Sequence, residues 1–471
     1  MKIEFWGATR EVTGSCFLIE VNGRRLLVEC GLVQGEPADE ERNRAPFPFD
    51  VQQLDAVILT HAHLDHSGRV PLLVKAGYRG PIYTHSASRD LARIMLKDAG
   101  YLNEKDVEWE NRKRQRKHLT LLEPLYTMTD AQAAMRRFKA MEYGESVEIM
   151  HGVTLRLQDA GHILGSAIVE LWLEEGGVRR KIVFSGDLGH RGAPILCDPA
   201  VVSEADLVVM ESTYGDRAHR SWEDTWAELD EVFSIMQQGR GNILIPAFAV
   251  GRTQELLYAF KRNYARWNLD RWAIFLDSPM AIEATEVYGR HYQLFDREAR
   301  SERRHNGDIF ELPNLHLTRT AQQSMRINRV ESGAIIIAGS GMCEGGRIKH
   351  HFKHNIWRRQ CQVLIVGFQA KGTLGRALVE GIDTIHLWGE AIRVAAKIRT
   401  IGGFSAHADC NGLADWYGGF NARPPVVLVH GEPQAMDPFA VRLNSQGAQQ
   451  VFTPAHGATL DLIHFKLKAK S

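Results

Sequence analysis

The chain has 471 residues, and its 57 Lys and Arg are balanced by 57 Asp and Glu, so the formal net charge is zero. This balance excludes a protein that selects a polyanionic partner by overall charge, but it leaves room for a local basic surface. The length exceeds the size at which a single hydrophobic core usually stops growing and therefore predicts two domains.

The six cysteines are scattered along the chain and form no Cys-x-x-Cys pair. That pattern favours a reduced, cytoplasmic protein over a disulfide scaffold. The first residues enter a strand-like run directly, without the apolar segment of a signal peptide, and no apolar stretch is long enough to span a bilayer. We therefore expect a soluble cytoplasmic protein without a membrane partner.

The amino-terminal 30 residues are predicted to form two or three strands, with turns at Gly14 and at Asn22-Gly23. Asn-Gly between alternating apolar residues is a strong hairpin signal. The last of these strands ends on Glu29. This carboxylate either supports a neighbouring metal site or is a solvated acid at a strand end, and the local pattern does not decide between the two.

The segment 60–68 contains three histidines and an aspartate within six residues: His61, His63, Asp65 and His66. It lies between a buried apolar strand, 54–59, and a short helix, 70–77, that ends at glycine. Such a turn at the carboxyl end of a strand is where α/β folds place their chemistry. Burying so many polar groups without a partner is costly, so the segment predicts a metal site, and its ligand types suit zinc.

The next part of the chain is less informative. His85 follows a short strand and either lies near the metal turn or has no part in the chemistry. Residues 86–143 are charged and show only weak helical periodicity. The basic run 112–118 suggests phosphate binding, but a solvated helix face is the commoner explanation of such a run and is the one we favour.

Five later positions repeat the pattern of a polar residue in a turn after a strand-like run. They are His162, Asp187, Glu211, His407 and His430. Taken singly, each is compatible with ordinary turn chemistry.

From about residue 212, strands alternate with helices, which predicts a parallel sheet in a second α/β layer. Three strands there run into loops of small residues, at 246–252, 339–342 and 367–373. Their backbone N–H groups could hold phosphate oxygens, or the loops could be simple turns. The residues predicted to contact RNA or phosphate here are Arg252, Ser340, Gly341, Met342 and Lys371.

These motifs occur in an order that resembles the β-CASP branch of the metallo-β-lactamase-fold nucleases. The most specific are Glu-Ser-Thr-Tyr at 211–214, Ser-Gly-Met at 340–342 and Phe-Ser-Ala-His-Ala-Asp at 404–409. The branch includes the endonuclease subunit of the eukaryotic cleavage and polyadenylation specificity factor. The resemblance covers essentially the whole chain. It implies an α/β protein, with an αββα metallo-β-lactamase domain at 1–210 and 396–471 and an inserted β-CASP domain at 211–395.

The resemblance also implies a site with two zinc ions bridged by Asp187. One zinc would be bound by His61, His63, His162 and Asp187, and the other by Asp65, His66, Asp187 and His430. The catalytic residues would be Asp65, Asp187, Glu211 and His407. Here Glu211 orients His407, which donates a proton to the leaving oxygen or, alternatively, hydrogen-bonds the phosphate. Glu29 would support the metal turn from behind, where the family usually has aspartate.

The implied function is a zinc-dependent ribonuclease that hydrolyses phosphodiester bonds of single-stranded RNA, in RNA processing or decay, and leaves 5′-phosphate and 3′-hydroxyl ends. His430 favours RNA, because DNA-repair relatives usually have valine at that position. The alternatives are a DNA nuclease and a hydrolase of a small ester or thioester. Endonuclease and 5′ exonuclease action both remain open, and a homodimer is expected because dimers are common in the family.

Overall fold

The structure is a computed structural model, which describes residues 1–35, 37–236 and 241–469. The chain divides into two compact units. The first unit comprises Met1–Arg191, Asp198–Ala218 and His407–Ser471, and the second comprises Gly192–Cys197 and His219–Ala406. The second unit's long segment thus begins at His219 and ends at Ala406, whereas we predicted domain boundaries at 210 and 395. Those boundaries stay predictions.

The first unit contains two sheets. The eight-stranded sheet has the order β23-β22-β1-β2-β3-β4-β5-β6. Its strands are β1 (Lys2–Gly7), β2 (Cys16–Val21), β3 (Arg24–Val28), β4 (Ala56–Ile58), β5 (Ile82–His85), β6 (Phe138–Met141), β22 (Thr459–Asp461) and β23 (Lys466–Lys468). The predicted hairpin turn is present, with Asn22 and Gly23 both at positive φ, 51° and 69°.

The seven-stranded sheet has the order β21-β20-β11-β10-β9-β8-β7. Its strands are β7 (Ser146–Met150), β8 (Val153–Asp159), β9 (Ala167–Glu175), β10 (Val178–Phe184), β11 (Leu207–Glu211), β20 (Val426–Val429) and β21 (Val451–Phe452). Strands β10, β11, β20 and β21 are parallel neighbours. The sheet therefore joins the middle of the chain to its carboxyl-terminal segment.

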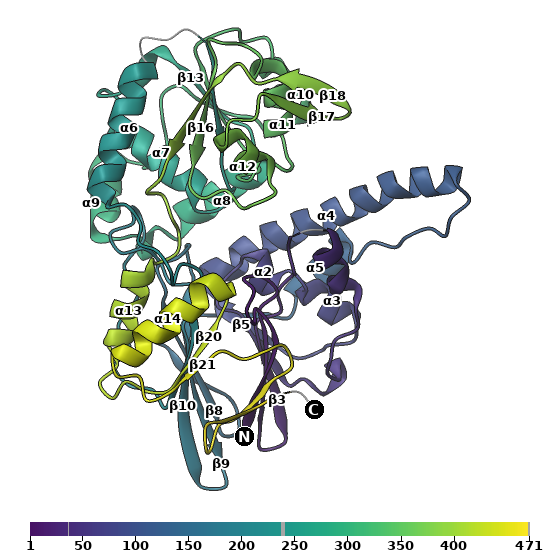
Figure 1. Cartoon of the computed structure of the whole chain (residues 1–471), viewed down its shortest axis with the longest axis vertical. Helices are drawn as coiled ribbons and strands as arrows, with labels where there is room; N and C mark the ends of the chain where they lie inside the picture. The colour runs from purple at the N-terminus through teal and green to yellow at the C-terminus, as the bar shows by residue number, and fades with distance from the viewer. Residues whose placement is uncertain (36, 237–240, 470–471) are drawn as a thin grey trace. The chain divides into compact units, whose positions relative to one another are not determined.

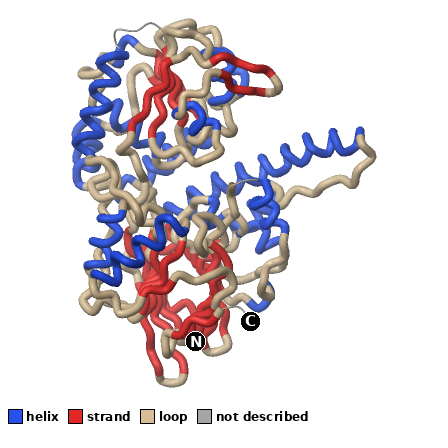
Figure 2. The backbone as a smooth tube through the Cα atoms, in the orientation of Figure 1, coloured by secondary structure: helices blue, strands red, loops and turns tan. Residues whose placement is uncertain are grey.

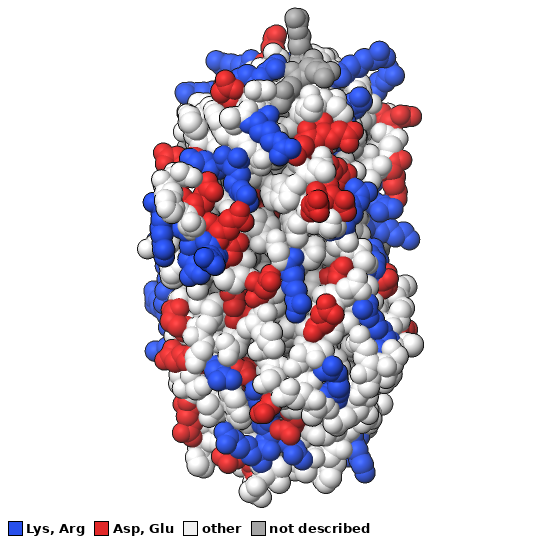
Figure 3. Space-filling view, turned by 90° about the vertical axis from the view of Figure 1, so that its left-hand side faces the viewer, with Lys and Arg blue, Asp and Glu red and all other residues white. Residues whose placement is uncertain are grey.

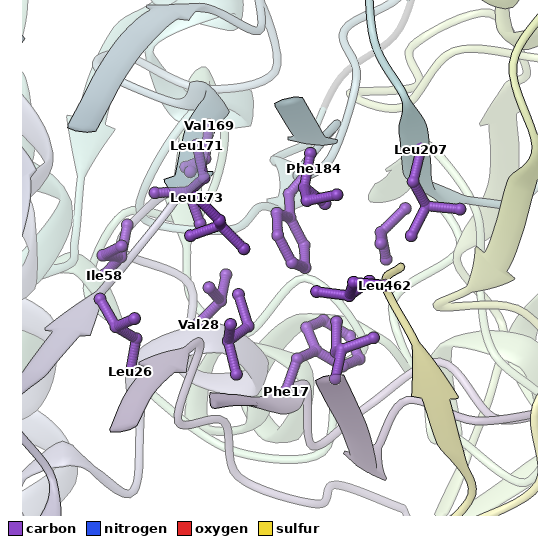
Figure 4. Close-up of a cluster of buried hydrophobic side chains, with 14 of the residues drawn as sticks. Phe17, Leu26, Val28, Ile58, Val169, Leu171, Leu173, Phe184, Leu207 and Leu462 are labelled. Atoms are coloured by element: carbon purple, nitrogen blue, oxygen red, sulfur yellow. The ribbon is translucent and has the colours of Figure 1, made fainter. Parts of the chain in front are cut away.

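The core of this unit lies between the two sheets. Because side chains alternate along a strand, Leu207 and Val209 of β11 point into this core, while Val208 and Met210 pack on the opposite face of the sheet. Figure 4 shows the inner side chains of both sheets pointing toward one another, among them Phe17 and Phe184. Their rings are stacked, with centroids 6.0 Å apart.

Helices cover the outer faces of both sheets, which gives the αββα arrangement (Figures 1 and 2). The helices of this unit are α1 (Pro37–Glu40), α2 (Leu64–Ser67), α3 (Val70–Lys75), α4 (Ser86–Arg116), α5 (Met128–Met135), α13 (Cys410–Gly418) and α14 (Pro433–Ser445), with 3₁₀ turns at Glu41–Arg44 and Val51–Gln53. Trp416 of α13 and Phe439 of α14 pack against Val208 and Met210. This packing buries both faces of β11, which explains its uninterrupted apolar sequence.

The second unit is built on a parallel six-stranded sheet of order β14-β13-β15-β12-β16-β19. Its strands are β12 (Ile243–Pro246), β13 (Ala273–Leu276), β14 (Leu315–Leu317), β15 (Ala334–Ala338), β16 (Gln362–Val366) and β19 (Lys397–Ile401), and a separate hairpin is formed by β17 (Thr384–Leu387) and β18 (Glu390–Arg393). Its helices are α6 (Trp222–Met236), α7 (Arg252–Arg262), α8 (Pro279–Arg290), α9 (Arg297–Asn306), α10 (Ala321–Ile327), α11 (Ile348–Asn355) and α12 (Leu374–Val379), with 3₁₀ turns at Leu269–Arg271 and Tyr292–Leu294. The alternation of strands and helices predicted from about residue 212 is therefore present.

The surface agrees with the balanced composition. Figure 3 shows Lys and Arg side chains intermixed with Asp and Glu over the face that it presents. Within the described ranges, none of the helices combines the length and the apolar character needed to cross a membrane.

Candidate metal centre

The sheet topology of the first unit brings the predicted ligands to one edge. Asp187, Glu211 and His430 lie at the carboxyl ends of β10, β11 and β20, which are parallel neighbours. The turn between β8 and β9 carries His162 to the same edge, because β9 runs antiparallel to β10. In the facing sheet, the turn that follows β4 carries the ligands from 61 to 66.

The first ligand group has four members whose ligand atoms lie within 4.8 Å of one another: His61, His63, His162 and Asp187. Nε2 of His61 and Nε2 of His162 lie 3.0 and 3.1 Å from Nδ1 of His63. Oδ2 of Asp187 lies 3.4 and 3.6 Å from the same two Nε2 atoms. Ligands at about 2.0–2.1 Å from a tetrahedral zinc ion lie about 3.3 Å from one another. The spacing therefore fits one tetrahedral cation.

The second ligand group consists of Asp65, His66 and His430. Nε2 of His430 lies 3.0 Å from Nε2 of His66 and 3.3 Å from Oδ2 of Asp65. Asp187 also faces this group, because its Oδ1 lies 3.3 Å from Nε2 of His66 and 3.6 Å from Nε2 of His430. The two carboxylate oxygens of Asp187 therefore face different ligand groups.

Asp187 provides a direct test of whether a cation fits. Its side chain is 2% exposed, and its Oδ1 atom is buried without a hydrogen-bond partner among the residues that the structure describes. A buried carboxylate oxygen without a partner is costly. A cation among Asp187, His66 and His430 would give this oxygen a partner, and the Nε2 atoms of His66 and His430, 3.0 Å apart, are close enough to bind the same ion. The residues present therefore fit a metal on both sides of Asp187.

The protonation states of the first group suit metal binding. Burial lowers the pKa of His61, and burial likewise lowers the pKa of His63 to about 4. Both rings are therefore neutral at physiological pH, as metal ligands must be. Burial would raise the pKa of Asp187, but the surrounding histidines hold it well below its usual range, so this carboxylate is ionised.

Three polar residues hold the ligand rings from behind. Oε2 of Glu29 lies 3.0 Å from Nδ1 of His66, and Oε1 of Glu29 accepts a hydrogen bond from the Thr60 backbone N–H at 2.6 Å. Oγ1 of Thr60 lies 2.9 Å from Nδ1 of His61. Oγ1 of Thr213 lies 2.9 Å from Nδ1 of His430. Such partners fix the orientation of each ring.

Thr60 and Thr213 were not among the predicted site residues. Their only signal in the sequence is their position in these motifs: Thr60 precedes His61, and Thr213 follows Glu211 by two residues. Glu29 and His430 also have positive φ, 67° and 51°, an uncommon conformation for residues other than glycine. Strained backbone of this kind is concentrated at functional sites.

His407 and Glu211 form a pair beside the first ligand group. Nδ1 of His407 lies 3.3 Å from both carboxylate oxygens of Glu211 and 4.0 Å from Oδ2 of Asp187. Burial lowers the pKa of His407, but Glu211 and Asp187 raise it to about 9. Glu211 is itself anchored, because it accepts a hydrogen bond from the Leu188 N–H at 2.6 Å. This geometry suits an imidazole that donates a proton.

Comparison with known proteins agrees with the fold and the site. Models of three families match the chain: the metallo-β-lactamase superfamily at residues 9–115, the β-CASP domain at 253–378 and the zinc-dependent metallo-hydrolase RNA specificity domain at 391–454. Ribonuclease TTHA0252 of Thermus thermophilus is 39% identical over 436 residues, which are 93% of this chain and 94% of that protein. The chain belongs to the β-CASP family.

Further relatives are transcription termination factors. The transcription termination factor FttA of Methanocaldococcus jannaschii is 32% identical over 99% of this chain and 72% of its own length, and FttA of Pyrococcus abyssi is 33% identical over 92% and 67%. A crystal structure of a protein of unknown function from Enterococcus faecalis covers 98% of this chain and 99% of its own, with a TM-score of 0.52 and 11% identity. This last likeness concerns the fold alone.

The second unit contains the β-CASP match, and we call it the β-CASP unit. Its three small-residue loops lie together, because β15, β12 and β16 are adjacent parallel strands. Nε2 of Gln369 donates to the Gly341 carbonyl at 3.0 Å, and the Met342 carbonyl accepts from the Gly375 N–H at 3.1 Å. A Cβ on Gly341 would lie 2.7 Å from the Phe248 ring. The loops therefore pack against one another, with Ser340 and Met342 half-buried.

The other residues predicted to contact phosphate in the β-CASP unit differ in accessibility. Lys371 is exposed. Arg252 is buried, because its guanidinium forms an ion pair with Glu255 and donates to the Phe404 carbonyl at 2.7 Å. The charge of Arg252 is thus already paired inside the unit, which does not support its predicted contact with RNA.

His85 has a structural role that the sequence left open. It is fully buried at the start of α4, where its Nδ1 accepts a hydrogen bond from the Ala87 N–H at 3.1 Å. Its Nε2 lies 3.2 Å from Oε2 of Glu142, and its ring stacks on Tyr143 at 4.0 Å. His85 belongs to none of the metal-binding groups found among the described residues.

Proposed function

We propose that this chain is a metal-dependent ribonuclease that hydrolyses phosphodiester bonds of single-stranded RNA, and that its metal is a pair of zinc ions. The observation that carries this proposal is the position of Asp187, whose two oxygens face separate ligand groups. One zinc would be held by His61, His63, His162 and Asp187, and the other by Asp65, His66, Asp187 and His430. A site of this kind is the established way to stabilise both oxygens of an in-line displacement at phosphorus.

When bound, two such cations lower the pKa of water at the site and stabilise negative charge on a phosphodiester. The residues of the chain have their own tasks around this centre. Glu211 holds Nδ1 of His407, which places the Nε2 proton on the opposite side of the ring. His407 then donates this proton to the 3′ oxygen that leaves, as a general acid. Cleavage of the bond between phosphorus and the 3′ oxygen leaves a 5′-phosphate on one product and a 3′-hydroxyl on the other.

RNA is favoured over DNA on three grounds. The relative that covers most of this chain at 39% identity is named a ribonuclease, and a zinc-dependent RNA specificity domain matches residues 391–454. The residue at the last ligand position is His430 rather than the valine expected of DNA-repair members. A DNA nuclease and a small-ester or thioester hydrolase are the competing functions. We further place the protein in the cytoplasm, because its six cysteines are free thiols.

The test is digestion of end-labelled RNA and DNA of matched sequence by the purified protein, with zinc content measured by atomic absorption. We expect about two zinc ions per chain, cleavage of RNA in preference to DNA, and loss of cleavage in Asp65→Ala. Undiminished cleavage by Asp65→Ala, or equal cleavage of DNA, would overturn the proposal. A circular RNA in the same assay separates endonuclease from exonuclease action, and sedimentation tests the expected homodimer.

A further inference from the structure

Helix α4 extends beyond the rest of the first unit. Its buried residues all lie in the first half of the helix, and the last of them is Gly100. Figure 1 shows the remainder of the helix running outward, with the chain returning beside it. Residues 101–116 are one continuous helical segment, which at 1.5 Å per residue is about 24 Å long. We call residues 101–121 the α4 arm.

The arm is ordered by its own contacts. Nδ2 of Asn111 donates to the Leu122 carbonyl at 2.9 Å, and the Leu122 N–H donates to Oδ1 of Asn111 at 2.8 Å. Nε of Arg114 donates to the Thr120 carbonyl at 2.5 Å. These bonds attach the returning chain to one face of the helix and leave the opposite face to solvent.

The solvent face of the arm carries a stripe of alternating aromatic and basic side chains. Helical spacing of three and four residues aligns its members, which are Tyr101, Lys105, Trp109, Arg112, Lys113 and Arg116. Tyr101 is 46% exposed and Trp109 is 60% exposed. Nζ of Lys113 lies 3.1 Å from the centroid of the Trp109 ring. Exposed rings with cations beside them are the elements that bind a single nucleic-acid strand.

The charge of the arm points to the same partner. The run 112–118 contains five Lys and Arg and no acid, although the whole chain is neutral. Glu108 lies within the stripe, but it is paired with Lys105 at 2.8 Å and Arg112 at 2.5 Å. Lys113 lies 3.6 Å from Glu110, but both side chains are exposed. The run 112–118 therefore still leaves a local positive surface next to the exposed Trp109 ring.

We propose that the solvent face of the α4 arm binds single-stranded RNA at a place separate from the metal centre, and so captures the strand that is to be cleaved. Phosphates contact Lys113 and Arg116, and a base stacks on Trp109. The proposal rests on the proposed function in one respect, because it takes RNA as the substrate. In this role the long helix positions RNA, and the arm takes no part in the chemistry.

The test compares RNA binding by arm variants in an Asp65→Asn background, which keeps the RNA intact. The arm variants are Trp109→Ala and the pair Lys113→Gln with Arg116→Gln. The matched control is Lys466→Gln with Lys468→Gln, which removes two exposed charges from strand β23. Fluorescence anisotropy is measured with RNA of about 30 nucleotides, long enough to reach the arm, and of about 6 nucleotides, too short to span both places.

We expect at least about fivefold weaker binding of the long RNA by either arm variant, and unchanged binding of the short RNA. Removal of two phosphate contacts also lowers the slope of log Kd against log salt by about 1.4. In the active protein, the arm variants raise KM for long RNA and leave kcat unchanged. Trp109→Phe, which keeps a ring, retains binding.

Equal binding of the long RNA by the arm variants and the control would overturn the proposal. So would a change confined to the oligomeric state in sedimentation, since the arm would then be a contact between copies of the chain. Helix content by circular dichroism shows that each variant is folded. If the parent protein binds long RNA through the arm but the active protein cleaves none, the proposed function fails and the arm proposal stands.

Discussion

Glu29 links the two halves of the metal turn through its two carboxylate oxygens, one toward the Thr60 N–H and one toward the His66 ring. Both partners are donors, so Glu29→Gln would place an amide N–H against one of them. We expect Glu29→Gln to weaken zinc binding about 10- to 100-fold, as for other residues that orient metal ligands. Competition with a chromogenic chelator measures the affinity. Glu29→Asp, which keeps two acceptors, is the control, and an unchanged affinity in Glu29→Gln would contradict this role.

His407 lies beside the ligands, and its two possible roles predict different outcomes. If it is the proton donor, His407→Gln lowers kcat by about 10²- to 10⁴-fold and leaves the zinc content unchanged. If it is a ligand, together with Asp187 and Glu211, the zinc content falls as well. We expect the first outcome, because Nδ1 of His407 is directed at Glu211. Single-turnover cleavage and metal analysis of the same sample separate the two.

At the scale of elements, the turns that carry His162 and Asp187 pack backbone to backbone. A Cβ on Gly189 would lie 1.9 Å from the Gly161 carbonyl oxygen, and Gly161 cannot move without moving His162. We expect Gly189→Ala to lower the free energy of unfolding by about 1–3 kcal/mol and to weaken zinc binding. Gly289→Ala, on an open face of α8, is the control and should be neutral or stabilising by about 0.5–1 kcal/mol. Urea denaturation with and without zinc measures both, and equal behaviour of the two variants would contradict the prediction.

Asp277, at the end of β13, joins three loops of the β-CASP unit. It accepts hydrogen bonds from one ring nitrogen and one guanidinium nitrogen, each at 2.6 Å, and from two hydroxyls at 2.5 and 2.6 Å. These donors belong to His351, Arg347, Thr318 and Ser324. Burial raises the pKa of Asp277, but these bonds together lower it to about 2. The folded-state pKa is below the unfolded value, so its contribution is present above about pH 4 and is lost as the pH falls toward 2.

The contribution of Asp277 should therefore depend on pH in a defined window. The shift corresponds to about 2 kcal/mol of stability at neutral pH. We expect the free energy of unfolding of the wild-type protein to exceed that of Asp277→Asn by at least this amount at pH 6, and the difference to shrink between pH 4 and pH 2. Chemical denaturation at several pH values gives both curves. A difference independent of pH would show that the ionised carboxylate is not the source.

At the scale of the whole molecule, the metal centre needs both ends of the chain. His430 directly follows β20, which pairs with β11, and β22 pairs with β1. A chain that ends near residue 400 lacks these strands. We expect it to lose the second zinc and all cleavage, and to regain both when residues 401–471 are co-expressed. Zinc analysis and RNA digestion measure this outcome, and an active truncated chain would contradict the arrangement.

Much of the fold and the site could be predicted because the signals are local. The hairpin at Asn22-Gly23 and the alternating strands and helices after about residue 212 depend on neighbouring residues, and the structure contains them. The length of α4 could not be predicted, because its outer half buries no apolar stripe that would mark a helix. The support that Thr213 gives to His430 was missed for another reason: the two residues are separated by 217 positions and meet only through β11 and β20.

The sequence by itself determined which side chains can bind metal and that each stands in a turn after a strand, because ligand chemistry and turn formation are encoded by adjacent residues. Only the tertiary structure decided which of these side chains lie together. Asp65 and His430 are 365 positions apart, yet Oδ2 of Asp65 lies 3.3 Å from Nε2 of His430. The two carboxylate oxygens of Asp187 face the two separate ligand groups. These distances depend on the order and direction of the strands, which bring the carboxyl ends of β10, β11 and β20 to one edge of a sheet.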